Sequence, residues 1–238
     1  ENRLVKWRKG LYLLFCLMSL IPTVQARETV VLLHGLARSS GSMDRIGQRL
    51  EEAGYRVVNL SYPSTDFPVE ELAVMVHEQV LRETPEAERI HFVTHSMGGI
   101  LVRYIQANWP LQNLGRVVML SPPNQGSEVV DKLGGFGLYQ KINGPAGRQL
   151  GTDPATSIPL QLGAVDFELG IITGDRSINW ILSSLIPGKD DGKVSIERAR
   201  IQGMTAFKVV HATHPLIMYK KSVIADILSF LKSGTFND

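Results

Sequence analysis

Short β-rich runs alternate with longer helical patterns along most of the chain, and this alternation limits the choice of fold more than any other feature. Residues 29–35, 89–95 and 116–123 are apolar and rich in β-branched side chains, as buried strands are. Residues 42–53 and 69–83 instead place their apolar side chains on one face of a helix. Strands that alternate with crossover helices form a parallel sheet, so the sequence predicts an α/β fold whose mostly parallel central sheet carries helices on both faces.

The length that follows residue 26 suits one domain. These residues contain no internal repeat, and the periodic pattern weakens only in a Gly- and Pro-rich stretch at residues 134–159. About 45 residues separate Pro123 from Phe167, too few for a separate cap. We therefore predict a single domain over residues 27–238, with no large cap domain.

The first 26 residues have the composition of a secretory signal. Four basic residues precede an apolar run at 11–24, and Ala26 offers a small residue for cleavage. Pro22 interrupts the run, which is shorter than the ~20 apolar residues that a spanning helix needs. We predict a cleaved signal peptide at 1–26 and export to the periplasm or the medium. The alternative is an inner-membrane anchor through residues 11–24.

Cysteine and charge exclude two further classes of protein. Cys16, the single cysteine, lies inside the apolar run, so the remainder of the chain folds without disulfides. Without residues 1–26, the 25 basic and 23 acidic residues become 21 and 22, and the net charge changes from +2 to −1. No concentrated basic face remains, so we expect no nucleic-acid partner.

Ser96 lies where a strand gives way to a helix. In "FVTHSMGGIL" (residues 92–101) the serine falls on the tight turn between the two, beside the free N–H groups of the helix N-terminus. Thr94 replaces the first glycine of a G-x-S-x-G pattern. The turn predicts a nucleophile, and the alternative is a serine that only caps the helix.

A serine nucleophile needs an oxyanion hole. The first strand ends in "LLHGLARSSG" (residues 32–41), and the His-Gly pair leaves the backbone N–H of Leu36 free to face a developing negative charge. The N–H of Met97, directly after the serine, is expected to be the second donor. His34 itself is open to a second interpretation, as a buried structural histidine.

The serine also needs a base, and "KVVHATHPLIMY" (residues 208–219) offers two histidines after the last strand. We favour His214, because it begins the loop before the final helix and Pro215 suits a first helical turn. His211, at the strand end, is the alternative.

A carboxylate that orients this histidine should precede it in the chain. Asp175 directly follows a predicted strand, whereas Asp190 and Asp191 share the polar turn "PGKDDGKV" at residues 187–194. A helix cap and a solvated turn are the non-catalytic interpretations of these three residues.

These motifs together resemble the α/β-hydrolases, and among them the small bacterial lipase and esterase group. The resemblance covers most of residues 29–232 and rests on "HG" after the first strand, "HSMGG" at the turn, "SPPNQGSEVVD", "DGKV" and "HPL". It implies that Ser96 is the nucleophile, His214 the general base and then acid, and Asp191 the orienting carboxylate, with Leu36 and Met97 as the oxyanion hole. The implied reaction is a two-step ester hydrolysis through an acyl-enzyme.

In such enzymes the segment after the fourth strand borders the acyl site. Leu133, Phe136, Leu138 and Tyr139 are therefore expected to line an open substrate pocket, although they would serve equally well as local core. The expected partner is a small-molecule or lipid ester, and a lipid ester would add contact with a membrane surface. No metal-ligand spacing occurs, so we predict no metal and no cofactor.

Two other functions share these residues. An acyltransferase or thioesterase would use the same triad. The first would differ in the molecule that attacks the acyl-enzyme, and the second in the group that leaves when the acyl-enzyme forms. A non-catalytic binding module would keep the fold, but it would be expected to lack a triad member, and the sequence retains a candidate for each.

Overall fold

A computed structural model of the protein describes residues 28–178 and 183–237. Within these residues, six strands form one sheet in the order β2-β1-β3-β4-β5-β6, and every neighbouring pair is parallel. The strands are β1 (Thr29–Leu33), β2 (Arg56–Leu60), β3 (Ile90–His95), β4 (Leu114–Leu120), β5 (Leu169–Gly174) and β6 (Ala206–Val210). The predicted parallel α/β sheet is confirmed.

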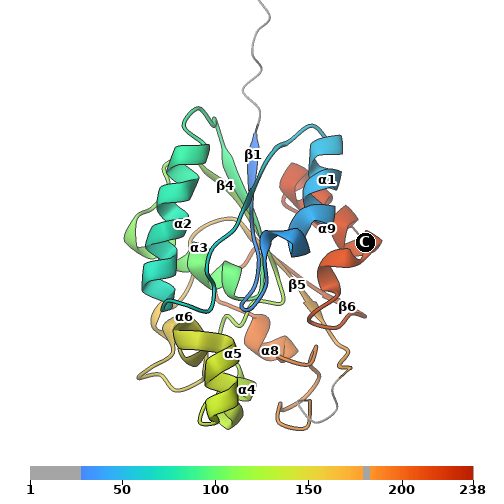
Figure 1. Ribbon diagram of the computed structural model, residues 1–238. Coiled ribbons are helices and arrows are strands. Elements are labelled where there is room, and N and C mark those ends of the chain that lie inside the picture. Colours follow the sequence, from blue (N-terminus) through green and yellow to red (C-terminus); the bar gives the residue numbers. More distant parts are fainter. Residues whose placement is uncertain (1–27, 179–182, 238) are drawn as a thin grey trace, which may run out of the picture.

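Helices cover both faces of the sheet (Figure 1). On one face lie α2 (Val69–Glu83) and α3 (Met97–Asn108), and on the other lie α1 (Asp44–Glu52) and α9 (Lys221–Ser233). Each face has its own apolar core, and alternate residues of β1 point into the two: Val31 and Leu33 into one, Val30 and Leu32 into the other. A strand that is buried on both faces must be apolar throughout, which explains the unbroken run at residues 29–33.

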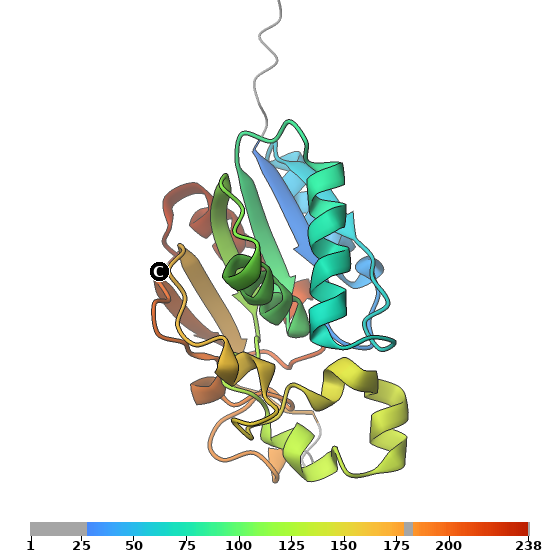
Figure 2. The ribbon, with the colours of Figure 1, turned by 90° about the vertical axis from the view of Figure 1, so that its left-hand side faces the viewer.

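Short helices lie beyond the carboxyl ends of the strands (Figure 2). They are α4 (Glu128–Leu133), α5 (Gly137–Arg148), α6 (Ile158–Gln161) and α8 (Ile196–Ala199), with two 3₁₀ turns, η1 (Ser40–Met43) and η2 (Ile217–Tyr219), elsewhere in the chain. Much of the Gly- and Pro-rich stretch at 134–159 is therefore helical, which its weak periodicity did not predict. Gly144 bends α5 with a φ of 62°, and a Cβ there would lie 1.6 Å from the carbonyl oxygen of Thr65.

The strand order creates a switch point at this same end of the sheet. Residues after β1 run to one side, towards β2, and residues after β3 run to the other, towards β4. The loops that follow β1 and β3 therefore diverge and leave a crevice between them, where open α/β sheets bind ligands.

The predicted signal or anchor, residues 1–26 with its apolar run at 11–24, lies outside the described residues. Among the helices of residues 28–178 and 183–237, none combines the length and the apolar character needed to cross a membrane.

Candidate active site

Ser96 occupies a strained turn between β3 and α3. Its φ of 52° and ψ of −123° lie outside the regions that a side chain ordinarily allows. Gly98 permits this close approach of helix and strand, because a Cβ there would lie 2.8 Å from the carbonyl oxygen of Leu33 and 2.9 Å from that of His34. The turn lifts the serine side chain clear of the sheet.

The Ser96 hydroxyl does not cap α3, although the residue stands at the N-cap position. Its Oγ lies instead 3.1 Å from Nε2 of His214. Both side chains are almost fully buried, with 9% of Ser96 and 4% of His214 exposed. The strained turn therefore positions the hydroxyl for a histidine 118 residues away in sequence.

Asp191 completes a hydrogen-bonded chain from serine to carboxylate. His214 Nδ1 lies 2.9 Å from Oδ2 of Asp191, whose Oδ1 accepts the backbone N–H groups of Lys193 and Val194 at 3.0 and 2.9 Å. Burial by itself raises the pKa of this carboxyl, but the charge and hydrogen bond of His214 hold the pKa below its usual value. Asp191 therefore stays ionised and fixes the proton of His214 on Nδ1.

The other candidates for acid and base lie nearby with different partners. Asp190 accepts the hydroxyl of Ser183 and, at 2.6 Å, the N–H of Gly192, so it holds the turn that carries Asp191. Asp175 and His211 form their own pair, with Oδ1 3.0 Å from Nδ1, and the imidazole is 68% exposed. Neither residue contacts Ser96.

The backbone N–H groups of Leu36 and Met97 donate no hydrogen bond to any residue within 28–178 and 183–237. His34 fixes the turn before Leu36. Its imidazole stacks on Tyr62 with 4.1 Å between ring centroids, its Nδ1 lies 2.9 Å from the carbonyl oxygen of Gly35, and its own carbonyl accepts the Tyr62 hydroxyl. The imidazole of His34 thus helps to hold the backbone turn that presents the N–H of Leu36.

His95 is a buried neighbour of the site to which the sequence patterns assigned no catalytic role. Its Nε2 donates to the backbone carbonyl of His214 at 3.0 Å, and the two rings lie 4.8 Å apart. Burial lowers the pKa of His95 well below the usual value, and the positive charges of His214 and Arg38 lower it further. Its position directly before Ser96 is the sequence feature that could have indicated that His95 belongs to the site.

A cavity of about 230 Å³ opens onto Ser96 and His214. Its apolar wall includes Leu36, Val129, Val130, Leu150, Ile178 and Val194.

Of the four predicted pocket residues, Tyr139 lines this cavity, and Leu133, Phe136 and Leu138 do not. For Phe136 and Leu138 the reason is the orientation of α5: Tyr139 and Asn143, one turn apart, face the cavity, whereas Phe136 and Leu138 are 64% and 72% exposed. Leu133 instead ends α4. In the described ranges, no three His, Cys, Asp or Glu side chains gather in a way that would hold a metal ion.

Comparison with known proteins assigns the family. The family model described as "Alpha/beta hydrolase family" matches residues 30–211, about three quarters of the chain. The chain belongs to the alpha/beta hydrolase family. A search of curated proteins finds no match.

Solved structures with the same fold include lipolytic enzymes. A mature lipase of Bacillus licheniformis is 19% identical, with a TM-score of 0.65 over 89% of this chain and 94% of the lipase. A metagenomic carboxyl esterase is 19% identical, with a TM-score of 0.66 over 89% of this chain and 72% of the esterase. Phospholipase PlaB from Legionella pneumophila is 20% identical, with a TM-score of 0.59 over 73% of this chain and 45% of the phospholipase. At these identities the likeness establishes the fold.

Proposed function

We propose that this protein is a serine hydrolase that cleaves carboxylic esters through an acyl-enzyme on Ser96. The observation that carries the proposal is the continuous hydrogen-bonded chain from Ser96 Oγ through His214 to Asp191, at the edge of an apolar cavity. The lipase and esterase folds among the structural neighbours support it.

In the first step His214 Nε2 removes the hydroxyl proton while Ser96 Oγ attacks the ester carbonyl carbon. The carbonyl electron pair moves onto oxygen, where the N–H groups of Leu36 and Met97 stabilise the negative charge. The intermediate collapses, the bond to the alcohol oxygen breaks, and His214 returns its proton to the leaving alkoxide. The acyl group remains on Ser96.

In the second step water takes the place of the alcohol. His214 removes a proton from the water, whose oxygen attacks the acyl carbon, and the collapse of this intermediate releases the carboxylic acid and restores the Ser96 hydroxyl. Asp191 stays ionised throughout and stabilises the imidazolium.

The cavity suits the acyl chain of the ester. Its volume is about 230 Å³, and its wall is largely apolar.

A fluorophosphonate tests the proposal, since it reacts with activated serines. Wild-type protein should hydrolyse 4-nitrophenyl butyrate and carry one adduct on Ser96 by mass spectrometry. Ser96→Ala should lose both adduct and hydrolysis, by roughly 10⁴-fold or more in kcat. A folded Ser96→Ala protein that retained full hydrolysis would overturn the proposal.

A further inference from the structure

Two cations stand on the wall of the cavity. Arg38 and Lys193 line it together with Asp191, the third charged residue in the lining. Asp191 is fully buried and bonded to His214, whereas Arg38 is half-buried and Lys193 is exposed. The charge that an entering ligand meets is therefore positive, although the chain outside residues 1–26 carries a net charge of −1.

The backbone that carries each cation is fixed by the same turns that hold the site. Arg38 lies two residues past Leu36, and its Nη2 lies 3.4 Å from the carbonyl oxygen of Pro215, beside His214. Lys193 lies two residues past Asp191, and its carbonyl accepts the Ser127 hydroxyl at 2.6 Å. The Arg38 guanidinium is thus tied to the loop of His214, and the backbone of Lys193 is tied to Ser127.

Neither cation has a counter-ion among residues 28–178 and 183–237, whereas Arg198, in the helix that follows the Lys193 turn, pairs with Glu128 at 2.8 Å. The two cations also interact electrostatically with each other. Although much of the Lys193 residue is exposed, desolvation of its ammonium group lowers its pKa, and the positive charge of Arg38 lowers this pKa further, against the effect of Asp191. Two like charges beside one cavity repel each other, and an anion bound between them would remove that repulsion.

We propose that Arg38 and Lys193 form an anion-binding subsite, so that the preferred substrates are esters that carry a phosphate or carboxylate group close to the scissile bond. The inference rests on the proposed function, because it assigns a substrate class to the same cavity. The apolar wall takes the acyl chain, and the two cations hold the anionic part of the alcohol.

The test uses soluble hexanoyl esters in pairs matched for size and different in charge. In the carboxylate pair the alcohol is glycolate or its neutral amide. In the phosphate pair it is 2-hydroxyethyl methyl phosphate or the corresponding neutral dimethyl phosphate. Each kcat/KM is divided by the rate constant for hydrolysis of the same ester catalysed by neutral imidazole, which corrects for intrinsic reactivity without the repulsion that hydroxide has for an anionic ester.

For wild-type protein the anionic ester should be favoured roughly tenfold over its neutral partner in at least one pair. The pair that shows the preference identifies phosphate or carboxylate as the group recognised. R38Q/K193Q should reduce the ratio to about one, and raising the salt concentration from about 0.02 M to about 0.5 M should reduce it in wild-type protein. Arg45→Gln and Lys189→Gln, which remove cations that do not line the cavity, should leave the ratio unchanged.

Hydrolysis of the neutral esters without an anionic preference, or a preference that persists in R38Q/K193Q, would overturn the subsite and leave the proposed function intact. Failure to hydrolyse any of the four esters would count against the proposed function. Calorimetry on Ser96→Ala protein then decides the subsite separately. Tighter binding of an anionic ester, lost in the additional R38Q/K193Q background, would support it, and equal binding of the matched esters would overturn it.

Discussion

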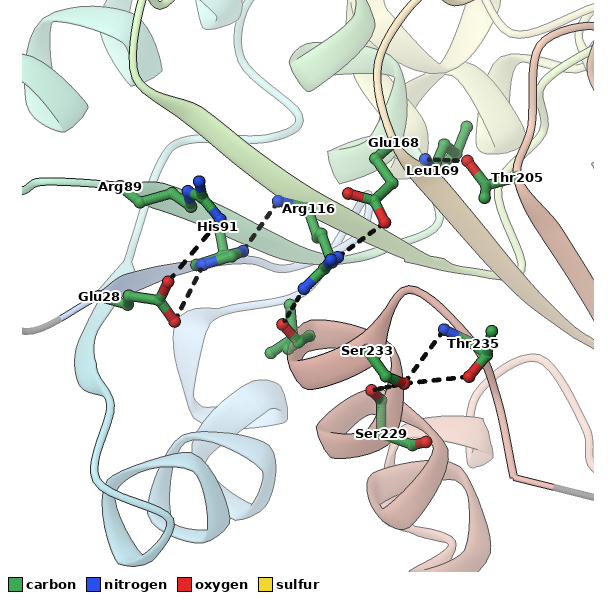
Figure 3. Close-up of polar contacts among 11 residues, drawn as sticks. Glu28, Arg89, His91, Arg116, Glu168, Leu169, Thr205, Ser229, Ser233 and Thr235 are labelled. Atoms are coloured by element: carbon green, nitrogen blue, oxygen red, sulfur yellow. Dashed lines mark hydrogen bonds and ion pairs between the residues drawn. The ribbon is translucent and has the colours of Figure 1, made fainter.

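The two ends of the sheet each hold a buried histidine beside a carboxylate, and the two arrangements differ in which ring nitrogen is free. At the carboxyl end, Nδ1 of His214 faces Asp191 and Nε2 faces the Ser96 hydroxyl. At the amino end, Nδ1 of His91 accepts the backbone N–H of Arg116 at 2.8 Å, and Nε2 lies 3.6 Å from Glu28 (Figure 3).

This difference fixes opposite tautomers. Asp191 holds the proton of His214 on Nδ1 and leaves the Nε2 lone pair for the serine. In neutral His91 the only lone pair is already occupied by the Arg116 N–H, so the ring cannot act as a base. A buried histidine beside a carboxylate is thus a candidate base only where its second nitrogen meets a group that can give up a proton.

The amino-end cluster has the character of a structural network. Arg116 pairs with Glu168 at 2.8 Å and donates to the Leu231 carbonyl of α9 at 3.0 Å, so it ties the sheet to a helix (Figure 3). Burial lowers the pKa of His91, Glu28 opposes this shift, and Arg89 and Arg116 add to it.

The largest expected difference comes from replacing each histidine by glutamine. His214→Gln should lower kcat/KM for 4-nitrophenyl butyrate by about 10⁴-fold or more, because no base remains for Ser96. His91→Gln should stay within about twofold of wild type, since the ring lies at the opposite end of the sheet. Steady-state kinetics on folded proteins checks both, and comparable losses in the two variants would refute the distinction between the two histidines.

The carboxylates should show the next largest effect. Asp191→Asn should lower kcat by about 10³–10⁴-fold, because the amide favours the wrong tautomer of His214. Glu28→Gln and Asp175→Asn should change kcat by no more than about twofold, and Asp190→Asn by less than about tenfold, since its oxygen can still accept the Gly192 N–H. An Asp190→Asn loss as large as that of Asp191→Asn would show that the turn, rather than the charge on Asp191, is what His214 requires.

Substitution of two glycines, one at each end of the sheet, distinguishes effects on packing from effects on catalysis. A Cβ at Gly98 would meet the Leu33 carbonyl oxygen at 2.8 Å, and a Cβ at Gly115 would meet the His91 ring at 2.7 Å. Alanine at either position should lower the free energy of unfolding by about 1–3 kcal/mol through overpacking.

Only Gly98→Ala should also lower kcat, by about 10–100-fold, because it displaces the turn that carries Ser96. Urea unfolding and kinetics on the same preparations give the two readouts. A kcat for Gly115→Ala as low as that for Gly98→Ala would indicate that strain spreads across the whole sheet.

The smallest expected effect concerns stability against pH. Burial is the main cause of the lowered pKa values of His91 and His95, whereas in the unfolded chain both imidazoles take up protons near pH ~6.5. Below that pH the unfolded state binds more protons, so the free energy of unfolding falls as the pH decreases.

Burial lowers the pKa of His34 in the same way, and His91→Gln removes one of these three groups. Its loss of stability between about pH 7 and about pH 5 should therefore be smaller than that of wild type, by an amount on the order of 1 kcal/mol. Urea unfolding at the two pH values measures it, and an equal loss would mean that His91 takes up a proton in the folded protein as well.

Local patterns predicted much of the fold. The helix at 69–83 has the predicted bounds, and the strand-to-helix junction at Ser96 lies where the sequence placed it. The pattern failed at residues 134–159, because glycines and Pro145 hide the periodicity of α5, and the same failure misplaced Phe136 and Leu138 at the cavity. Leu133, the last residue of α4, does not line the cavity either.

The sequence by itself determined the alternating elements, the buried strands and the serine turn, because each depends on residues within a few positions of one another. Only the tertiary structure decided which of two adjacent aspartates reaches His214, which nitrogen of each histidine is free, and that Arg38 and Lys193 share one cavity. These pairings join residues that are far apart in the chain, as Ser96 and His214 are by 118 positions. They exist only where the packing of the sheet brings distant loops to the same edge.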